Sequence, residues 1–317
     1  MGLDKHSVPA VSHVTIDDRR SGQRLDNFLI ATLKGVPRTH IYRIVRRGEV
    51  RINRARAKPD YKLRQGDVVR LPPMRTNPVQ SPRQDGERFA WIESRILYED
   101  PALLILDKPS GLAVHGGSGI DVNLIDALRA LRAAQVGFLE LVHRLDRETS
   151  GCLLIAKSRA ALTGLHEQLR EGRVVKEYLA LVRGSWAGGA RQVDLALERS
   201  GFASGGRKVR ASIVGKASST QFSPVQRFGT ATLLRVRLDT GRTHQVRVHA
   251  QAIGHPIAGD TKYGDRTFNA ELRRLGLKRL FLHAERLALY HPVSGAALSV
   301  TAPVPVDLAA VLERCRR

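Results

Sequence analysis

The sequence predicts an α+β protein of two domains, the larger of which contains a mixed, mostly antiparallel sheet. Three observations predict this fold class. Apolar runs of strand length recur from Ile96 to Val300, helical spacings separate only some of these runs, and a polar stretch rich in Pro, Ser and Gln divides the chain. A regular alternation of strands and helices would instead have favoured a doubly wound parallel sheet. The 317 residues are enough for two domains.

The first domain is expected over residues 19–72, as a small α/β unit that follows a disordered N-terminus at 1–18. Leu25, Phe28 and Leu29 follow helical spacing, and Gly48 stops a second helical pattern. The expected elements are helices over 21–33 and 37–47 and strands over 50–52 and 67–71.

A linker is expected over residues 73–90, because this stretch is polar, rich in proline and without hydrophobic period. The second domain is then expected over 91–317. Its expected strands lie at 96–98, 103–106, 153–156, 178–182, 231–238 and 297–300, and its expected helices at 124–131, 160–170 and 244–253.

The composition indicates a polyanionic partner. The formal net charge is +22 and the pI is about 11.0, which favours nucleic acid. No apolar run approaches 18 residues, so a membrane partner is not expected. The two cysteines, Cys152 and Cys315, have no CxxC companion, which excludes a disulfide framework and fits a reducing cytoplasm. Aromatic residues make up only 5%, so binding should depend on phosphate contacts and shape.

Basic side chains are most concentrated in the first domain. Residues 19–90 carry 18 basic and 6 acidic side chains. The outward face of the second expected helix holds four arginines: Arg38, Arg43, Arg46 and Arg47. Such a row is usually only a solvated face, but further basic residues follow in the adjoining hairpin. The pattern therefore favours RNA binding.

Several familiar chemistries are excluded by missing motifs. The sequence has neither a P-loop nor a G-x-G-x-x-G fingerprint, so nucleotide-driven and dinucleotide-dependent enzymes are not expected. There is no H-E-x-x-H, and the histidines show no metal-ligand spacing. The loop from His115 to Gly119 resembles an esterase oxyanion loop, but no nucleophile elbow accompanies it. A basic hydrolase would therefore lack its nucleophile.

Two charged clusters remain as candidate sites. In the first, residues 143–151, Asp146 lies between two arginines at the junction of two apolar runs. This pattern alone favours a structural ion pair over a reactive group. In the second, residues 241–249, Arg242 is expected in a loop at a helix start, where Thr243 could cap the helix and Arg247 could share a face with His244. A solvated helix start is an equally good interpretation of the second cluster.

Taken together, the motifs resemble known families over most of the chain. Residues Ser21 to Leu71 resemble the S4 RNA-binding domain, through Arg24–Leu29, the arginine-rich helix, Gly48–Asn53 and Gly66–Asp67. From Ile96 onward the chain resembles the large-subunit ribosomal pseudouridine synthases. The matching motifs are Asp107–Gly111, Val114–His115, His143–Gly151, Lys176–Tyr178, Gly241–His249 and Arg279–Ala284.

This resemblance implies an isomerase that converts uridines of 23S rRNA into pseudouridine. It implies that Asp146 is the essential acid, reacting as a carboxylate, and that Arg242 pairs with it. Tyr178 would stack on the target base and is a candidate to accept the C5 proton, although a phenol is a poor base at neutral pH. Leu280 and Leu282 would form the apolar floor under the uracil.

Other residues are implied in RNA contact. Arg144, flanked by His143, would fill the space that the flipped-out uridine leaves. Supporting Asp146 is the alternative role for both residues. Lys108 and His115 are expected to contact the RNA backbone. The reaction needs no redox change or energy input, so no cofactor and no metal are expected.

The expected partner is 23S rRNA or an assembling large subunit, and the protein is expected to be a cytoplasmic monomer without membrane contact. Whether Asp146 attacks C1′ or abstracts the 2′ proton stays open. The alternative function is a non-catalytic RNA-binding assembly factor, which would not need Asp146, Tyr178 and Arg242 together.

Overall fold

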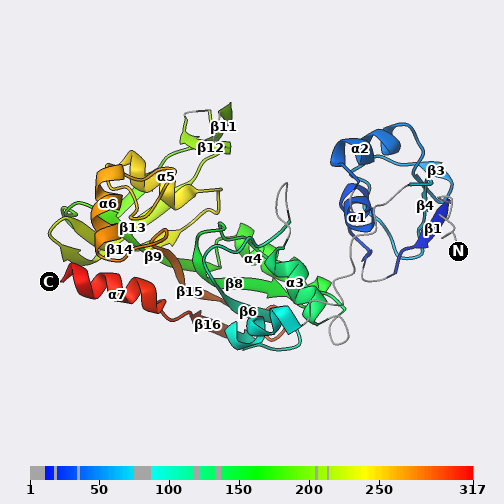
Figure 1. Ribbon diagram of the computed structural model, residues 1–317. Coiled ribbons are helices and arrows are strands. Elements are labelled where there is room, and N and C mark those ends of the chain that lie inside the picture. The colour runs from blue at the N-terminus through cyan, green and yellow to red at the C-terminus, as the bar shows by residue number, and fades with distance from the viewer. Residues whose placement is uncertain are drawn as a thin grey trace, which may run out of the picture. The chain divides into compact units, whose positions relative to one another are not determined.

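The computed structural model describes residues 11–17, 20–33, 36–74, 87–116, 122–132, 137–203, 206–212 and 214–316. The chain forms two compact units, Met1–Gln84 and Asp85–Arg317 (Figure 1). Each unit has its own hydrophobic core.

The first unit packs two helices on a small antiparallel sheet. The strand order is β1 (Ser12–Thr15), β4 (Val68–Leu71), β2 (Arg51–Ile52) and β3 (Ala55–Arg56), and the helices are α1 (Leu25–Thr32) and α2 (Arg38–Arg46). Phe28, Leu29 and Ile44 are buried in the core between sheet and helices. The predicted helices and both predicted strands are present, with bounds that differ by up to four residues.

The N-terminal segment differs from the prediction of disorder over 1–18. Residues Ser12–Thr15 form β1, which pairs with β4 so that Val14 lies opposite Val69. The adjacent Ile16 is buried in the core. The prediction missed this strand because only one of its four residues is strongly apolar. Residues 1–10 and 18 lie outside the described part of the chain.

Helix α2 separates its apolar and basic faces as predicted. Ile41, Ile44 and Val45 are buried, whereas Arg43, Arg46 and Arg47 are exposed. The chain leaves the helix at Gly48, whose φ of +73° is a left-handed conformation that glycine adopts without strain. The side chain of Arg38 is not among those described.

The second unit is built on a ten-stranded sheet. Its main path runs β10 (Arg191–Asp194), β13 (Ser219–Phe228), β14 (Ala231–Leu238), β9 (Val175–Arg183), β15 (Leu282–Tyr290), β8 (Ser150–Ala156), β6 (Leu103–Lys108) and β5 (Ile96–Glu99), with β16 (Ala297–Thr301) on β15 and β7 (Glu140–Leu141) on β8. Every pairing is antiparallel except β8 with β15. The predicted mixed, mostly antiparallel sheet is confirmed.

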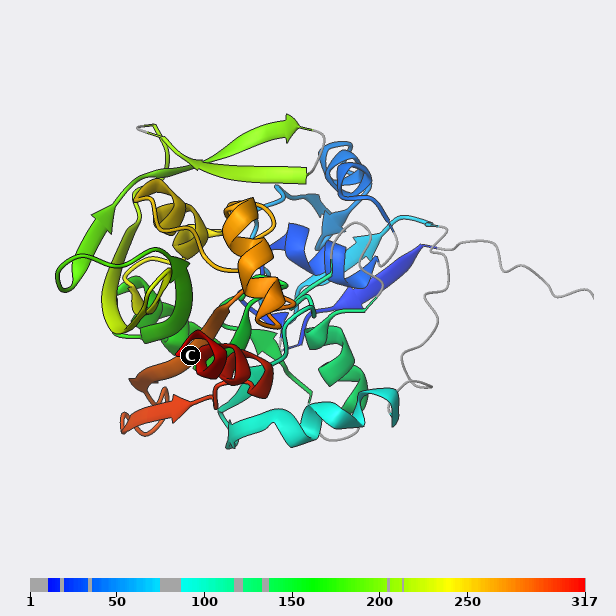
Figure 2. The same cartoon turned by 60° about the vertical axis from the view of Figure 1, so that its left-hand side comes forward.

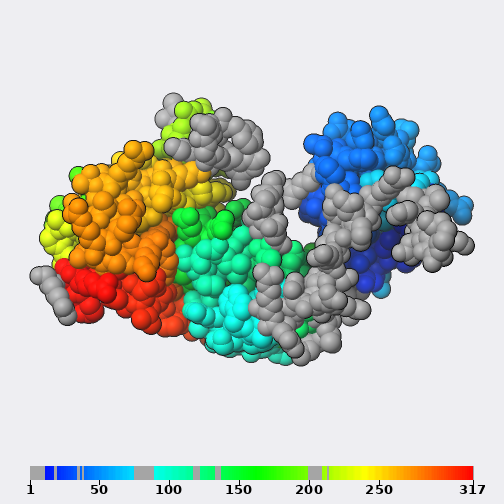
Figure 3. Space-filling model, viewed as in Figure 1, coloured from blue at the N-terminus to red at the C-terminus, as the bar shows by residue number. Residues whose placement is uncertain are grey.

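Helices flank this sheet. They are α3 (Leu124–Leu131), α4 (Arg159–Arg170), α5 (Gln245–Ala252), α6 (Arg266–Arg274) and α7 (Val306–Cys315), preceded by a 3₁₀ segment, η3 (Glu87–Arg95). Helices α6 and α7 share a core that includes Phe268 and Leu308, and the orange and red parts of the surface to which they belong adjoin in Figure 3. The linker predicted over 73–90 ends before Glu87, because η3 begins there and buries Phe89 and Ile92 in the core of the second unit. Residues 75–86 lie outside the described part.

A two-stranded hairpin, β11 (Leu197–Ala203) and β12 (Gly206–Ala211), extends from the body of the second unit as an arm (Figure 2). Its base is anchored by a small apolar cluster in which Leu197 and Val209 of the hairpin pack with Val248 of α5 and with Tyr263. This anchor places the hairpin against the helix that carries the second charged cluster.

Neither cysteine of the chain forms a disulfide, and Cys152 is buried. Within the described ranges, no helix is both long and apolar enough to cross a membrane.

Candidate functional site

The loop that carries Asp146 joins β7 to β8. Strand β8 then begins at Ser150, and its second residue, Gly151, has a φ of +107° and a backbone that lies against Ala284 of β15. A β-carbon at Gly151 would lie 2.2 Å from the carbonyl oxygen of Ala284. Only glycine therefore permits the parallel pairing of β8 with β15 at this point, and this pairing fixes the end of the loop.

Lys108 supports the loop from beneath. Its side chain is fully buried, and Nζ donates to the carbonyl oxygens of Pro109, Leu112 and Arg147 at 2.8, 2.9 and 3.0 Å. Burial lowers the pKa of Lys108 to about 7, while three carbonyl acceptors match the three protons of its charged form. The predicted contact of Lys108 with RNA is wrong, because the ammonium group is enclosed and its donors are used.

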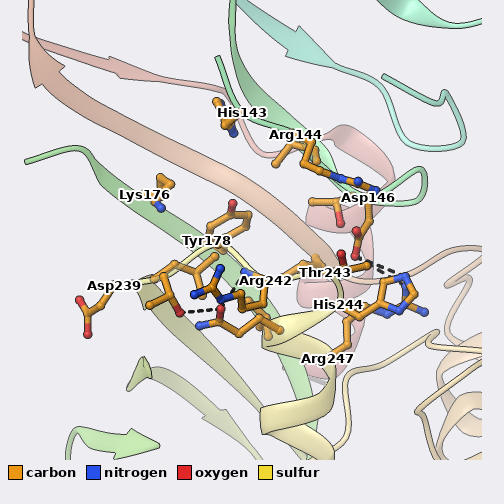
Figure 4. Close-up of a pocket in the computed structure, with 18 of the residues that line it drawn as sticks. His143, Arg144, Asp146, Lys176, Tyr178, Asp239, Arg242, Thr243, His244 and Arg247 are labelled. Carbon is orange, nitrogen blue, oxygen red and sulfur yellow. Dashed lines mark hydrogen bonds and ion pairs between the residues drawn. The ribbon is translucent and has the colours of Figure 1, made fainter. Parts of the chain in front are cut away.

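The two charged clusters meet across one pocket of about 310 Å³. His143, Arg144 and Asp146 line one wall from the β7–β8 loop, and the segment from Leu238 to Arg247 lines the opposite wall. Tyr178 of β9 and Leu282 at the start of β15 also line it (Figure 4). The sheet thus brings together residues from four distant parts of the sequence.

The side chain of Asp146 is 18% exposed and faces two basic groups. Its Oδ2 lies 3.8 Å from Nη1 of Arg247 and 4.0 Å from Nε2 of His244 (Figure 4). Arg247 is buried and holds Asp260 through a two-point pair, with Nε to Oδ2 at 2.7 Å and Nη2 to Oδ1 at 2.8 Å. Burial is the largest single influence and opposes the charge of Arg247, but the hydrogen bond to Asp260 and the negative charges of Asp260, Asp146 and Glu148 together outweigh burial and raise the pKa of Arg247. A fixed cation therefore faces Asp146.

The expected ion pair of Asp146 with Arg242 is absent among the described contacts, and this expectation is wrong. Arg242 is exposed, and its Nε makes a long contact of 3.5 Å with the carbonyl oxygen of Ala217. The reason is the helix start. Helix α5 begins at Gln245, so its first turn carries Arg247 towards Asp146 while Arg242 stays in the preceding loop. The helical spacing that placed Arg247 on the face of His244 was the available signal.

The α5 entry is held by Gln245 rather than by a Thr243 cap. Its Oε1 accepts from the hydroxyl of Thr240 at 2.7 Å and from the N–H of Arg242 at 3.0 Å, and its amide donates to Ser219 and Thr220. His244 occupies the N-cap position without a side-chain cap and with a φ of +56°. The left-handed backbone turns its ring towards Asp146 (Figure 4).

Tyr178 lines the pocket as an aromatic wall and is largely buried. Burial raises the pKa of its phenol, and the negative charge of Asp146 acts in the same direction. The hydroxyl therefore keeps its proton at neutral pH, which weighs against a role as free general base.

His143 is held as a neutral ring. Its Nε2 accepts the N–H of Leu154 at 3.0 Å, and burial lowers its pKa to about 4. Arg144 beside it is exposed and lines the pocket. His143 is therefore a fixed part of the pocket wall, whereas the exposed side chain of Arg144 can contact a ligand.

Five other predicted residues lie elsewhere. Leu280 does not line the pocket, because it precedes β15 and is buried where the backbone of residues 279–280 meets Gly259. His115 is exposed and also does not line it, and residues 117–119 of its loop lie outside the described part. Arg43, Arg46 and Arg47 are exposed in the first unit. Among the described residues, no group of three or more His, Cys, Asp or Glu side chains could hold a metal ion.

Comparison with known proteins decides the family. The chain is 52% identical over 308 residues to the ribosomal large subunit pseudouridine synthase C of Haemophilus ducreyi, covering 96% of each chain. It is 50% identical over 318 residues to the protein of the same name from Escherichia coli, covering 98% of this chain and 99% of that one. This chain belongs to the RNA pseudouridylate synthase family. The resemblance inferred from the motifs is confirmed, and the protein is an enzyme of the isomerase class.

Family models and solved structures agree with this assignment. The model described as RNA pseudouridylate synthase matches residues 102–252, and the S4 domain model matches residues 23–69. The structure of human RNA pseudouridylate synthase domain containing 4 matches with a TM-score of 0.61 and 28% identity, covering 74% of this chain and 97% of that one. In this pseudouridylate synthase, all residues that line the pocket around Asp146 except Leu282 lie inside the region that the first family model matches.

Proposed function

We propose that this enzyme converts specific uridines of large-subunit rRNA into pseudouridine, with Asp146 as the reacting carboxylate. The observation that carries the proposal is the position of Asp146 in the pocket, opposite the fixed cation of Arg247 and beside the ring of Tyr178. The relatives named for the large ribosomal subunit support the choice of 23S rRNA.

The reaction balances without a further reactant. The N1–C1′ bond breaks, the uracil turns, a C5–C1′ bond forms, and the proton on C5 leaves while N1 gains one. Asp146 either adds to C1′ and later departs, or removes the 2′ proton and later returns it. In both routes the carboxylate reacts in its ionised form, and the guanidinium of Arg247 lies 3.8 Å from it.

The remaining pocket residues receive roles in binding. Tyr178 and Leu282 would flank the uracil, with the exposed Arg144 filling the vacated stack and the neutral His143 supporting it. Arg242 is exposed at the rim and would contact a phosphate rather than Asp146. Leu280 would support the pocket only from the core.

The two parts of the chain would divide the work. We propose the first unit, which contains β1 to β4, as the domain that grips structured RNA through Arg38, Arg43, Arg46 and Arg47, and the second unit, which contains η3 and all later elements, as the catalytic domain. The enzyme would act as a cytoplasmic monomer on free rRNA or on an assembling subunit.

The direct test uses purified enzyme and 23S rRNA labelled with tritium at uracil C5. Wild type should release tritium, whereas Asp146→Asn should release none and bind RNA within a few fold of wild type. Asp126→Asn, which changes a half-exposed acid on α3, is the matched control and should behave as wild type. Tritium release by Asp146→Asn would refute the role of Asp146.

A further inference from the structure

Tyr263 lies behind the proposed catalytic pocket rather than in its wall, and only 5% of it is exposed. Its hydroxyl oxygen is 2.9 Å from Nδ1 of His244 and 2.9 Å from the backbone nitrogen of Val209 in β12. One phenol thus links the arm-like hairpin to the histidine that faces Asp146.

A count of protons fixes the direction of each hydrogen bond. The N–H of Val209 can only donate, so the phenol oxygen accepts from it. The single proton of the hydroxyl is then donated to Nδ1 of His244, which is the acceptor within hydrogen-bond distance among the described residues. A nitrogen that accepts carries no proton, so the proton of the neutral ring lies on Nε2. This is the nitrogen that lies 4.0 Å from Asp146.

The groups around His244 are consistent with a neutral ring. Asp146 and Asp260 favour its charged form, Arg247 and Lys262 disfavour it, and Tyr263 donates to its neutral form. Burial is the largest influence, and the pKa of His244 is lowered from its ordinary value. A neutral ring can present an N–H to Asp146 without adding a second positive charge to that of Arg247.

The geometry points to Tyr263 as a positioning residue that fixes His244 in its Nε2–H form against Asp146 and ties that form to the hairpin. The tautomer follows from the contacts alone, whereas its effect on catalysis rests on the proposed function.

Two further contacts show that Tyr263 is held in place. The guanidinium of Arg247 lies over its ring at 5.2 Å, so the two basic groups that face Asp146 share one support. The ring also packs with Leu197 and Val209 at the base of the hairpin. A shift of the hairpin would therefore change the hydrogen bond that sets His244.

The test of the tautomer uses ¹⁵N-labelled full-length enzyme and long-range ¹H–¹⁵N NMR, with His244 assigned from the missing signals of His244→Gln. Wild type should show a protonated Nε2 and an unprotonated, hydrogen-bonded Nδ1 between pH 6.5 and 8. In Tyr263→Phe the signature of hydrogen-bonded Nδ1 should disappear, and the titration of His244 should move to higher pH because the neutral form loses its donor. A proton on Nδ1 in wild type would overturn the inference.

The catalytic consequence is tested by single-turnover rates on 23S rRNA. Tyr263→Phe keeps the ring and should lower the rate about tenfold, with the RNA dissociation constant within about twofold of wild type. Tyr290→Phe, which changes a half-exposed tyrosine on β15, is the matched control and should leave the rate and the NMR spectrum of His244 unchanged.

The outcomes separate this inference from the proposed function. A wild-type rate in Tyr263→Phe, or a loss confined to RNA affinity, contradicts the positioning role. Absence of pseudouridine formation by wild type instead refutes the proposed function and leaves the NMR result on the tautomer intact.

Discussion

The guanidinium of Arg247 holds Asp260 at 2.7 and 2.8 Å through two of its nitrogens and directs the third towards Asp146 at 3.8 Å. The buried carboxylate of Asp260 therefore fixes the guanidinium of Arg247. This guanidinium in turn faces the carboxylate of Asp146. Asp260 also accepts from the N–H groups of Lys262 and Tyr263, so its oxygens are well satisfied. This arrangement makes Arg247 a rigid part of the pocket rather than a mobile surface charge.

Replacing Arg247 by lysine should impair catalysis strongly. Lysine keeps a charge but cannot bind Asp260 at two points and face Asp146 at the same time. We expect the single-turnover rate of Arg247→Lys on 23S rRNA to fall by about 100-fold, the size of effect seen when one preorganised charge is lost from a site. The same change at Arg242 should cost little in rate, because Arg242 does not pair with Asp146. Equal losses in both variants would contradict this assignment.

Removing the charge of Asp260, the partner of Arg247, should destabilise the fold. In Asp260→Asn the buried Arg247 loses its partner, which costs about 3–5 kcal/mol for a buried ion pair. Urea unfolding of the variant measures this loss. Asp307→Asn removes a half-exposed partner of Arg279 and should cost much less.

The same carboxylate predicts how stability depends on pH. Burial is the largest single influence and opposes ionisation of Asp260, but the hydrogen bond and charge of Arg247 together with the N–H groups of Tyr263 and Lys262 outweigh it and lower the pKa below the unfolded value of about 3.9. The stabilisation is therefore complete above the unfolded pKa and is lost as pH falls through the folded one. Between about pH 5 and 2 the unfolding free energy should fall more steeply for wild type than for Asp260→Asn. If the unfolding free energies of wild type and Asp260→Asn changed in parallel with pH, Asp260 would be ruled out as the origin of this pH dependence.

Lys108 should matter for stability and not for RNA contact. Lys108→Met removes one hydrogen-bond donor from each of three carbonyl groups. That of Arg147 keeps the N–H of Gly111, whereas those of Pro109 and Leu112 lose the donor described for them, so the unfolding free energy should fall by about 2–4 kcal/mol. The slope of log affinity against log salt should stay at its wild-type value, because no phosphate contact is removed. A shallower slope would restore the original expectation that Lys108 binds RNA.

The exposed arginines on α2 and at its C-terminal end, in contrast to Lys108, should matter for RNA binding and not for stability. Changing Arg43, Arg46 and Arg47 together to alanine should weaken rRNA binding and make the salt slope shallower by up to about 3, without lowering stability. The triple lysine variant keeps the charges and should retain the slope. An alanine triple variant with wild-type slope would exclude α2 from the RNA interface.

Much of the fold could be predicted because its periodic elements are strongly apolar. Helix α4 lies within one residue of the predicted 160–170, since its leucines recur at helical spacing. Helix α6 was missed because only Phe268 and Leu272 of its nine residues are buried. The hairpin was missed because its sequence is mostly polar and its position depends on the contact with Tyr263.

The sequence predicted which residues line the pocket better than it predicted which of them contact one another. Asp146, Tyr178 and Leu282 do share one pocket. The partner of Asp146 could not be chosen from sequence, because Arg242 and Arg247 are five residues apart and the choice depends on where α5 begins. The enclosure of Lys108 depends in part on the carbonyl group of Arg147, which is 39 residues away and which no local pattern indicates.

Pseudouridine mapping across 23S rRNA tests the central claim most directly. Cells lacking this protein would be supplied with wild type, with Asp146→Asn or with Asp126→Asn. The account predicts that specific pseudouridines vanish without the protein, return with wild type and Asp126→Asn, and stay absent with Asp146→Asn. An unchanged map in cells lacking the protein, or full restoration by Asp146→Asn, would contradict it.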